Sequence, residues 1–379
     1  MSLAYNDDER MLLEAAQEFL RAESPVSALR GLRDSADADG FSRVLWARMA
    51  EMGWTGLLVP EVHGGLGFSH MGAGILCEQM GRTLCASPFF ATAVLGVTVL
   101  NHAASAAQKA ALLPRVAAGE CILALALEES ARHAPLAIST RATATVDGFV
   151  LEGEKRFVLD AHVADTLIVA ARTSGAAGEA HGISLFLVDP GAPGVVVERN
   201  AMVDSRNAAT VTFQAVRLSP EALLGPLDGG FAPLERALDV ARSCAAAELL
   251  GVATEAFERT LDYLRQRKQF GKIIGEFQGL QHRAATLFCE LELARSAVLG
   301  ALRAADRPDA DLAAAASLAK ARATDTATLA VNEAVQMHGG IGMTDDFEIG
   351  FFMKRAAALR MLMGDAYYHT NRYATLAGY

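Results

Sequence analysis

Apolar residues recur every three or four positions in the first third of the chain, as they do within residues 8–24. There they form one stripe with a second stripe beside it: Leu12, Ala16 and Leu20, then Met11, Ala15 and Phe19. This period predicts an amphipathic helix. Residues 89–100 form the longest apolar run. A membrane span needs roughly 20 apolar residues, so this run predicts a buried core helix.

The pattern changes to short strands from about residue 119. Residues 141–155 alternate on both sides of Asp147-Gly148, a dipeptide that is typical of a tight β-hairpin. Residues 164–171 and 182–190 are continuous apolar runs bounded by turn residues, which predicts buried strands.

Helical patterning returns near residue 231 and is rich in alanine. Long helices are expected over residues 231–268 and 309–338, the second ending at Gly339-Gly340. Strands and helices do not alternate, so the predicted class is α+β rather than a doubly wound sheet. We expect an N-terminal all-α domain (1–118), a small β-barrel or β-sheet domain (119–228) and a C-terminal domain resembling a four-helix bundle (229–379).

Composition narrows the function classes. The chain has 379 residues, is 52% hydrophobic and carries a net charge of −10, which argues against nucleic-acid binding. Its five cysteines are scattered, which favours buried free thiols in a reducing compartment. No secretory signal opens the chain, and we expect a soluble cytoplasmic protein.

Common catalytic and nucleotide-binding motifs are missing. The sequence has no G-x-G-x-x-G after a strand, no Walker A, no HExxH and no G-x-S-x-G. Its nine histidines form no metal-like cluster, so no metal site is expected. Any dinucleotide must therefore be held by something other than a Rossmann turn.

Three segments suggest chemistry, although each also has a structural interpretation. LRQRKQFGKIIGEFQ (264–278) places cationic side chains beside an aromatic ring, as a pyrophosphate flanked by adenine would require, but it also suits a solvated charged face. VQMHGGIGM (335–343) allows close backbone approach to a ligand or a plain helix-ending turn. GWTGLLVPEVHGGLG (53–67) is a shaped loop that structure alone would explain.

In order and spacing, these segments resemble the acyl-CoA dehydrogenase family of flavoproteins. VDGFVLEGEKRFVLDAHVADTLIVAA is similar to the family's β-domain signature, and LLGPLDGGF to the entry to its C-terminal bundle. The resemblance covers residues 6–370 and implies FAD held between the β-domain and the bundle, completed by a neighbouring subunit. It implies FAD contacts at Leu127, Glu128, Phe157, Leu159, Arg267, Phe270, Gln278, Gln336, Gly339 and Gly340.

The implied reaction is α,β-dehydrogenation of an acyl-CoA thioester, in which a carboxylate removes the α-proton and a hydride goes to flavin N5. An electron-transfer flavoprotein is the implied electron acceptor. Phe157 stands at the usual tryptophan position, and Leu159 at the usual Thr or Ser position.

The chain departs from the family where the base belongs. Counting from Gly339-Gly340 brings the usual glutamate position to Met363, and the alternative position before Arg242 is Ala241. The family's TEPxxGSD loop reads LEESARHAPL (127–136), in which Arg132 and His133 are new. The catalytic base is therefore unknown, with Asp365 and Glu128 as weak candidates; Asp365 would lie about 200° round a helix from Met363.

Three hypotheses follow. The chain is an active dehydrogenase with a relocated base, in a homodimer or homotetramer. Alternatively, it is a catalytically silent subunit that completes the FAD site of an active paralogue in a hetero-oligomer. A third hypothesis, an oxidase or monooxygenase of the same family, has no positive support in the sequence.

Overall fold

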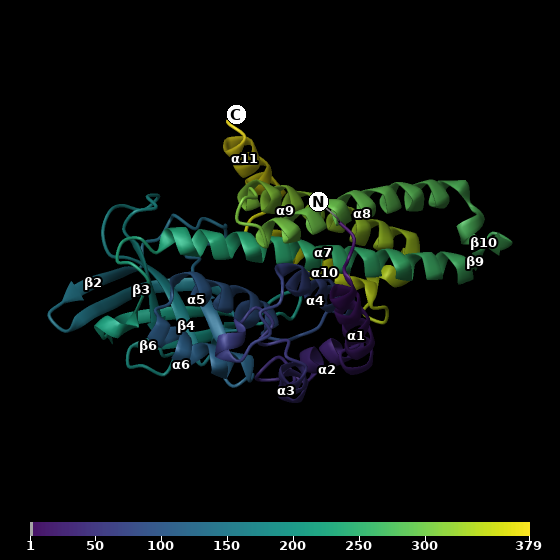
Figure 1. The fold of residues 1–379 in the computed structure, drawn as a ribbon. Coiled ribbons are helices and arrows are strands. Elements are labelled where there is room, and N and C mark those ends of the chain that lie inside the picture. The colour runs from purple at the N-terminus through teal and green to yellow at the C-terminus, as the bar shows by residue number, and fades with distance from the viewer. Residues whose placement is uncertain (1–2) are drawn as a thin grey trace. The chain divides into compact units, whose positions relative to one another are not determined.

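The computed structural model describes residues 3–379 and has an α+β architecture in the predicted order of helices, sheet and helices (Figure 1). The N-terminal helices are α1 (Asp7–Glu23), α2 (Val26–Asp34), α3 (Arg43–Glu51), α4 (His70–Thr83), α5 (Val97–Ala103) and α6 (Ala106–Ala117). The C-terminal helices are α7 (Phe231–Gln266), α8 (Gln278–Ala305), α9 (Leu312–His338), α10 (Ile349–Met361) and α11 (Ala366–Leu376). The predicted fold class is confirmed.

The central sheet has eight strands in the order β6-β7-β3-β2-β4-β5-β8, with β1 paired to β4 in parallel. Its strands are β1 (Leu123–Ala126), β2 (Arg141–Thr145), β3 (Gly148–Leu159), β4 (Thr166–Arg172), β5 (Ile183–Val188), β6 (Val195–Asn200), β7 (Ala208–Leu218) and β8 (Leu223–Leu224). The predicted hairpin is confirmed, because β2 and β3 pair antiparallel with Thr145 opposite Gly148. The two predicted buried strands are β4 and β5.

Two compact units make up the chain. The helical unit comprises residues up to 31, residues 70–85 and residues from 242 onward; the sheet unit comprises residues 32–69 and 86–241. Helix α7 carries the chain from the sheet unit into the helical unit. The division into three domains at about residues 118 and 228 stays a prediction.

Helix α7 packs unusually closely against α4 in the helical unit. A Cβ on Gly251 would lie 1.9 Å from the Glu78 carbonyl oxygen, and a Cβ on Gly81 would lie 2.3 Å from that of Glu248. Only glycine lets the two backbones approach this far. Buried ion pairs flank this crossing, with Arg295 2.9 Å from Glu78 and Arg355 3.2 Å from Glu248.

Helix α1 begins with a capping box, in which Asn6 accepts from the Glu9 N–H and Glu9 accepts from the Asn6 N–H. Two residues of its first predicted stripe, Ala16 and Leu20, are fully buried. The second stripe is wrong at Met11, which is 62% exposed. A single helix of 17 residues covers its neighbours with one face only, so the flanking stripe stays in solvent.

Two further expectations have mixed outcomes. Residues 89–100 are buried as predicted, although Phe90–Gly96 winds as a π-helix before α5. Four cysteines are buried, but Cys289 on α8 is exposed, which corrects the expectation of five buried thiols. No helix among residues 3–379 is both long and apolar enough to cross a membrane.

Candidate functional site

The sheet unit brings together the residues predicted at the flavin face. Strand β1 ends at Ala126, and the next two carbonyls are tied to β3: Leu127 O accepts from Lys155 Nζ at 3.0 Å, and Glu128 O accepts from the Arg156 N–H at 2.7 Å. The β3–β7 register shifts between Lys155 and Val158. This bulge gives Phe157 a φ of 52° and leaves it 41% exposed. Glu128 and Phe157 therefore lie near each other.

Leu159 is the last residue of β3 and pairs with Ala208 of β7. Its side chain is half-buried. Because a leucine side chain has no hydroxyl, any polar contact that Leu159 makes must come from its backbone.

Lys155 is a functional candidate that the sequence reasoning missed. It is fully buried, and its Nζ lies 2.7 Å from Glu129 Oε1. Burial lowers the pKa of Lys155 to about 8, although the charge of Glu129 opposes this. Lys155 lies an even number of residues after the buried Leu151 on β3, so both side chains point to the same face of the sheet. This alternation could have predicted from the sequence that Lys155 is buried.

Glu129 holds the loop of residues 127–136 to the sheet. Its carboxylate accepts from the backbone N–H groups of Ser139 and Thr140, at 2.7 and 2.9 Å, and from Lys155. Burial alone would raise the pKa of Glu129, but the charge of Lys155 and these hydrogen bonds together lower it. Glu129 therefore serves as an anionic anchor for the loop.

Glu128, a weak candidate for the base, is engaged within the same loop. His133 Nδ1 forms a hydrogen bond with Glu128 Oε1, and the Ala134 N–H donates to Oε2 at 3.2 Å. The Glu128 side chain is 22% exposed, whereas that of His133 is 2% exposed. The carboxylate thus remains accessible while its partner is buried.

The helical unit presents the second group of predicted cofactor residues. Between α7 and α8 the chain forms a small hairpin of β9 (Lys268–Gln269) and β10 (Lys272–Ile273), at the joint between these helices (Figure 1). Phe270 at its tip has a φ of 55° and is 90% exposed. Arg267 and Gln278 flank the hairpin and are also exposed. Cationic, aromatic and amide groups therefore gather on one projecting element.

Helix α9 ends beside the C-terminal part of α7. Gly339 caps α9 with a φ of 66°, and a Cβ added to Gly339 or Gly340 would meet nothing within 4 Å. His338 lies between two aromatic rings, with its ring centroid 4.4 Å from that of Tyr263 and 4.7 Å from that of Phe347. Tyr263 is one turn before Arg267, so the glycine turn and the hairpin lie at the same end of the unit.

Met363, at the usual base position, sits in a tight turn rather than on a helix. Its φ is 56°, and it is 9% exposed. His369 Nε2 donates to the Met363 carbonyl at 2.9 Å, and Lys320 Nζ donates to the Gly364 carbonyl at 2.8 Å. The backbone here is firmly held, while the Met363 side chain supplies only a thioether.

The structure shows the conformation around Asp365, which the sequence had left open. The chain is not helical between α10 and α11, so a helical angle from Met363 does not apply. Asp365 is the N-cap of α11, and its carboxylate accepts from the Tyr368 N–H at 2.8 Å. This capping role accounts for an acid at this position without catalysis.

The alternative base position is also closed. Ala241 is fully buried, and Arg242, the next residue, is fully buried as well. Arg242 Nη2 lies 3.4 Å from the Tyr368 hydroxyl, and its guanidinium carbon lies 5.9 Å from the centroid of the Tyr368 ring. The phenol side chain of Tyr368 thus lies beside Arg242 and packs over Gly364.

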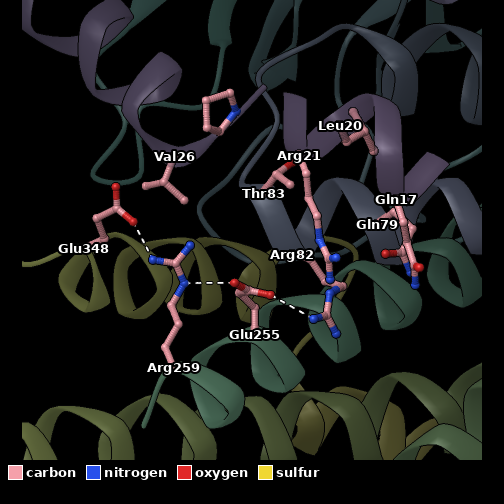
Figure 2. A pocket seen from close by; sticks show the side chains of 11 residues that line it. Gln17, Leu20, Arg21, Val26, Gln79, Arg82, Thr83, Glu255, Arg259 and Glu348 are labelled. Carbon is pink, nitrogen blue, oxygen red and sulfur yellow. Dashed lines mark hydrogen bonds and ion pairs between the residues drawn. The ribbon is translucent and has the colours of Figure 1, made fainter. Parts of the chain in front are cut away.

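A separate cavity of about 140 Å³ lies in the helical unit and contains none of the candidate residues (Figure 2). Arg82 and Arg259 both pair with Glu255, at 3.0 and 2.9 Å, and Arg259 also pairs with Glu348. These charges largely neutralise one another, so the cavity wall is a structural ion-pair network. No group of three or more His, Cys, Asp or Glu side chains that could hold a metal occurs within the described part of the chain.

Comparison with known proteins identifies the family. Three sequence profiles match in order: acyl-CoA dehydrogenase N-terminal domain over residues 6–120, middle domain over 124–216 and C-terminal domain over 228–375. The long-chain specific acyl-CoA dehydrogenase of Sus scrofa is 32% identical over 82% of this chain and 74% of the relative.

Solved structures agree with this assignment. Butyryl-CoA dehydrogenase from Megasphaera elsdenii has a TM-score of 0.91 with 25% identity, and the comparison covers 100% of both chains. A variant of the Tcur3481-Tcur3483 steroid ACAD has a TM-score of 0.87 with 31% identity over 98% of each chain. The chain belongs to the acyl-CoA dehydrogenase family.

Proposed function

We propose that this chain binds FAD and catalyses the α,β-dehydrogenation of an acyl-CoA thioester. The observation that carries the proposal is family membership along nearly the whole chain, joined to exposed residues of the right chemistry at the expected places. An acyl-CoA is the proposed substrate, and an electron-transfer flavoprotein is the proposed electron acceptor.

The residues present fit a flavin dinucleotide. The Arg267 guanidinium is exposed and can form paired hydrogen bonds with a pyrophosphate, while Phe270 offers a ring for an adenine to stack on. Gly339 and Gly340 leave space that a Cβ would partly fill, so a ligand can approach their backbone. Gln278 and Gln336 would add amide donors and acceptors. Gln336, together with Gly339 and Gly340, would contact the FAD of a second subunit.

The residues of the sheet unit are proposed to contact the ring system of the flavin. Phe157 would lie against the flavin, with Leu127, Glu128 and Leu159 beside it. FAD, when bound, supplies the acceptor for the hydride that leaves the β-carbon. The chain's own contribution is to orient the thioester, exclude water and take the α-proton.

A second candidate function is a catalytically silent subunit in a hetero-oligomer. The observation that favours it is the lack of a carboxylate at both usual base positions, together with the capping role of Asp365. The Tcur3481-Tcur3483 steroid ACAD, to which this chain is similar, bears the names of two components. In this case Gln336 and the Gly339-Gly340 turn would serve the FAD of the active partner.

The test is the anaerobic visible spectrum of the purified chain before and after addition of a panel of acyl-CoA thioesters. Bleaching of the flavin band by one thioester supports the dehydrogenase. A yellow protein that never bleaches, or a colourless one, contradicts it and favours the silent subunit. Met363→Glu then separates the cases further, because a silent subunit with an intact pocket should gain proton abstraction.

A further inference from the structure

We propose that Glu128 is the relocated base and that His133 positions it. The inference deepens the proposed function and rests on it, because it names the group that takes the α-proton of the thioester. The observations that carry it are the hydrogen bond between the two side chains, the contrast in their exposure, and the backbone bond that joins Glu128 to Arg156, next to Phe157.

Hydrogen bonds hold the Glu128 carboxylate in one orientation. One oxygen accepts from His133 Nδ1 and the other from the Ala134 N–H at 3.2 Å. The backbone of Glu128 is also fixed, since its carbonyl accepts from the Arg156 N–H at 2.7 Å. A carboxylate held at both oxygens on a fixed backbone loses little entropy when a substrate binds, as a general base requires.

Burial divides the roles between the two residues. A base must touch the substrate, and the Glu128 side chain is 22% exposed. The His133 side chain is 2% exposed, so it can orient Glu128 but is too buried to meet a thioester. His133 is therefore a positioning residue, and Glu128 is the residue that exchanges the proton.

The neighbouring acid is excluded by its partners. Glu129 accepts from Lys155 and from two backbone N–H groups, so its carboxylate is committed to the loop. Two titratable groups face Glu128: His133 of the same loop and Lys155 of β3, whereas the Arg156 guanidinium pairs with Glu154. Anchoring at Glu129 keeps the Glu128 segment in place while Glu128 itself remains accessible.

The location agrees with the proposed chemistry. Arg156, which holds the Glu128 carbonyl, precedes Phe157, the residue proposed to lie against the flavin. In the step, the α C–H bond of the thioester breaks and its electron pair remains on the substrate as an enolate. The proton forms an O–H bond with Glu128, and no electron leaves the substrate in this step.

Proton transfer can be measured without redox chemistry. The FAD-loaded chain is incubated in heavy water with an acyl-CoA whose β-carbon carries no hydrogen, so that it can lose the α-proton but cannot be oxidised. Mass spectrometry then follows deuterium entering the α-position. Flavin bleaching by ordinary acyl-CoAs is recorded in parallel, as is the melting temperature of each variant.

Four variants test the pair, with two controls. Glu128→Gln should slow α-exchange about 100-fold or more, the usual contribution of a general base. Glu128→Asp keeps the charge but shifts it, and should be intermediate. Glu152→Gln, at an exposed position of β3, should match the wild type.

The His133 variants separate positioning from folding. His133→Asn keeps a donor near the Nδ1 position and should retain most exchange, whereas His133→Leu should lose it. His181→Leu, at an exposed position of the same unit, should have no effect.

Three results would overturn the inference. Wild-type exchange in Glu128→Gln, with the flavin still bleached by a thioester, places the base elsewhere and leaves the proposed function standing. Identical exchange rates in His133→Leu, His133→Asn and wild type remove the positioning role. If the wild type neither exchanges nor bleaches, the dehydrogenase function fails and the inference fails with it.

Discussion

Lys320 offers a sharp test of how the turn at Met363 is held. It is fully buried on α9, and its Nζ donates to the carbonyls of Gly364 at 2.8 Å and Leu359 at 3.1 Å. Burial lowers the pKa of Lys320 from its ordinary 10.5 to about 7, although the charge of Asp365 opposes this. The perturbation is Lys320→Met, which keeps the length of the side chain and removes its donors.

Two effects of the substitution oppose each other near neutral pH. Losing a hydrogen bond to each carbonyl costs about 1–3 kcal/mol per bond. Against this, a pKa lowered from 10.5 to about 7 means that the ammonium is buried at a cost of about 5 kcal/mol when fully protonated. The net change at pH 7 is a small difference between these terms, so the pH dependence is the better diagnostic.

The sign follows from proton binding. Between pH 7 and 10.5 the unfolded chain keeps a proton on Lys320 that the folded chain has released. The free energy of unfolding therefore rises with pH between about 7 and 10.5, and below about 7 it no longer changes with pH through this group. The wild type should gain about 2 kcal/mol relative to Lys320→Met between pH 7 and pH 9.

The assay is urea-induced unfolding followed by circular dichroism at several pH values, with FAD at a fixed concentration. Lys354→Met removes a partly exposed lysine on α10 and should follow the wild-type profile. Parallel profiles for the wild type and Lys320→Met between pH 7 and 9 would refute the reasoning. The hydrogen bonds from the Lys320 ammonium to its carbonyl partners would then fully offset the free-energy cost of burying its charge.

Three further substitutions test the fold and the cofactor site. Gly251→Ala should destabilise the helical unit by about 3 kcal/mol, because its Cβ would lie 1.9 Å from a carbonyl oxygen, whereas Gly300→Ala on α8 meets nothing and should be neutral or slightly stabilising in thermal melts. Gly364→Ala, at a φ of 104° and with its Cβ 2.5 Å from the ring of Tyr368, should cost about 1–3 kcal/mol by the same measurement, and an unchanged melting temperature would count against a strained turn. Arg267→Ala should weaken FAD binding about 10-fold or more in a fluorescence titration without changing the melting temperature of the FAD-free chain, while Arg265→Ala, which loses only a surface pair with Asp262, should bind FAD normally.

The pattern of apolar residues determined the fold class and most elements. The hairpin at Asp147-Gly148 and the end of α9 at Gly339 were predictable because turn chemistry is local to a few residues. The sequence also located the loop at residues 127–136 as a departure from the family, since missing residue types can be read without coordinates. The roles of the flavin-facing residues remain predictions that the variants above would test.

Tertiary structure alone decided how charges are partnered. The alternation along β3 indicated that Lys155 is buried. Only the folded chain, in which β3 lies beside the residues that follow β1, brings the Lys155 ammonium to Glu129. Asp365 looked like a possible substitute base until the chain left the helical path at Met363 and made it an N-cap. Glu128 and His133 are five residues apart. The conformation of the loop, and no periodic pattern, brings their side chains within hydrogen-bonding distance.

The physical reason is the range of the interactions. Periodicity and turn propensity depend on neighbours within a few residues, so the sequence by itself determined most helices and strands. The availability of a carboxylate depends on which donors and charges other segments bring within about 3 Å of it. Only the folded chain settles that, and it leaves Glu128 accessible while committing Glu129 and Asp365 to structural roles.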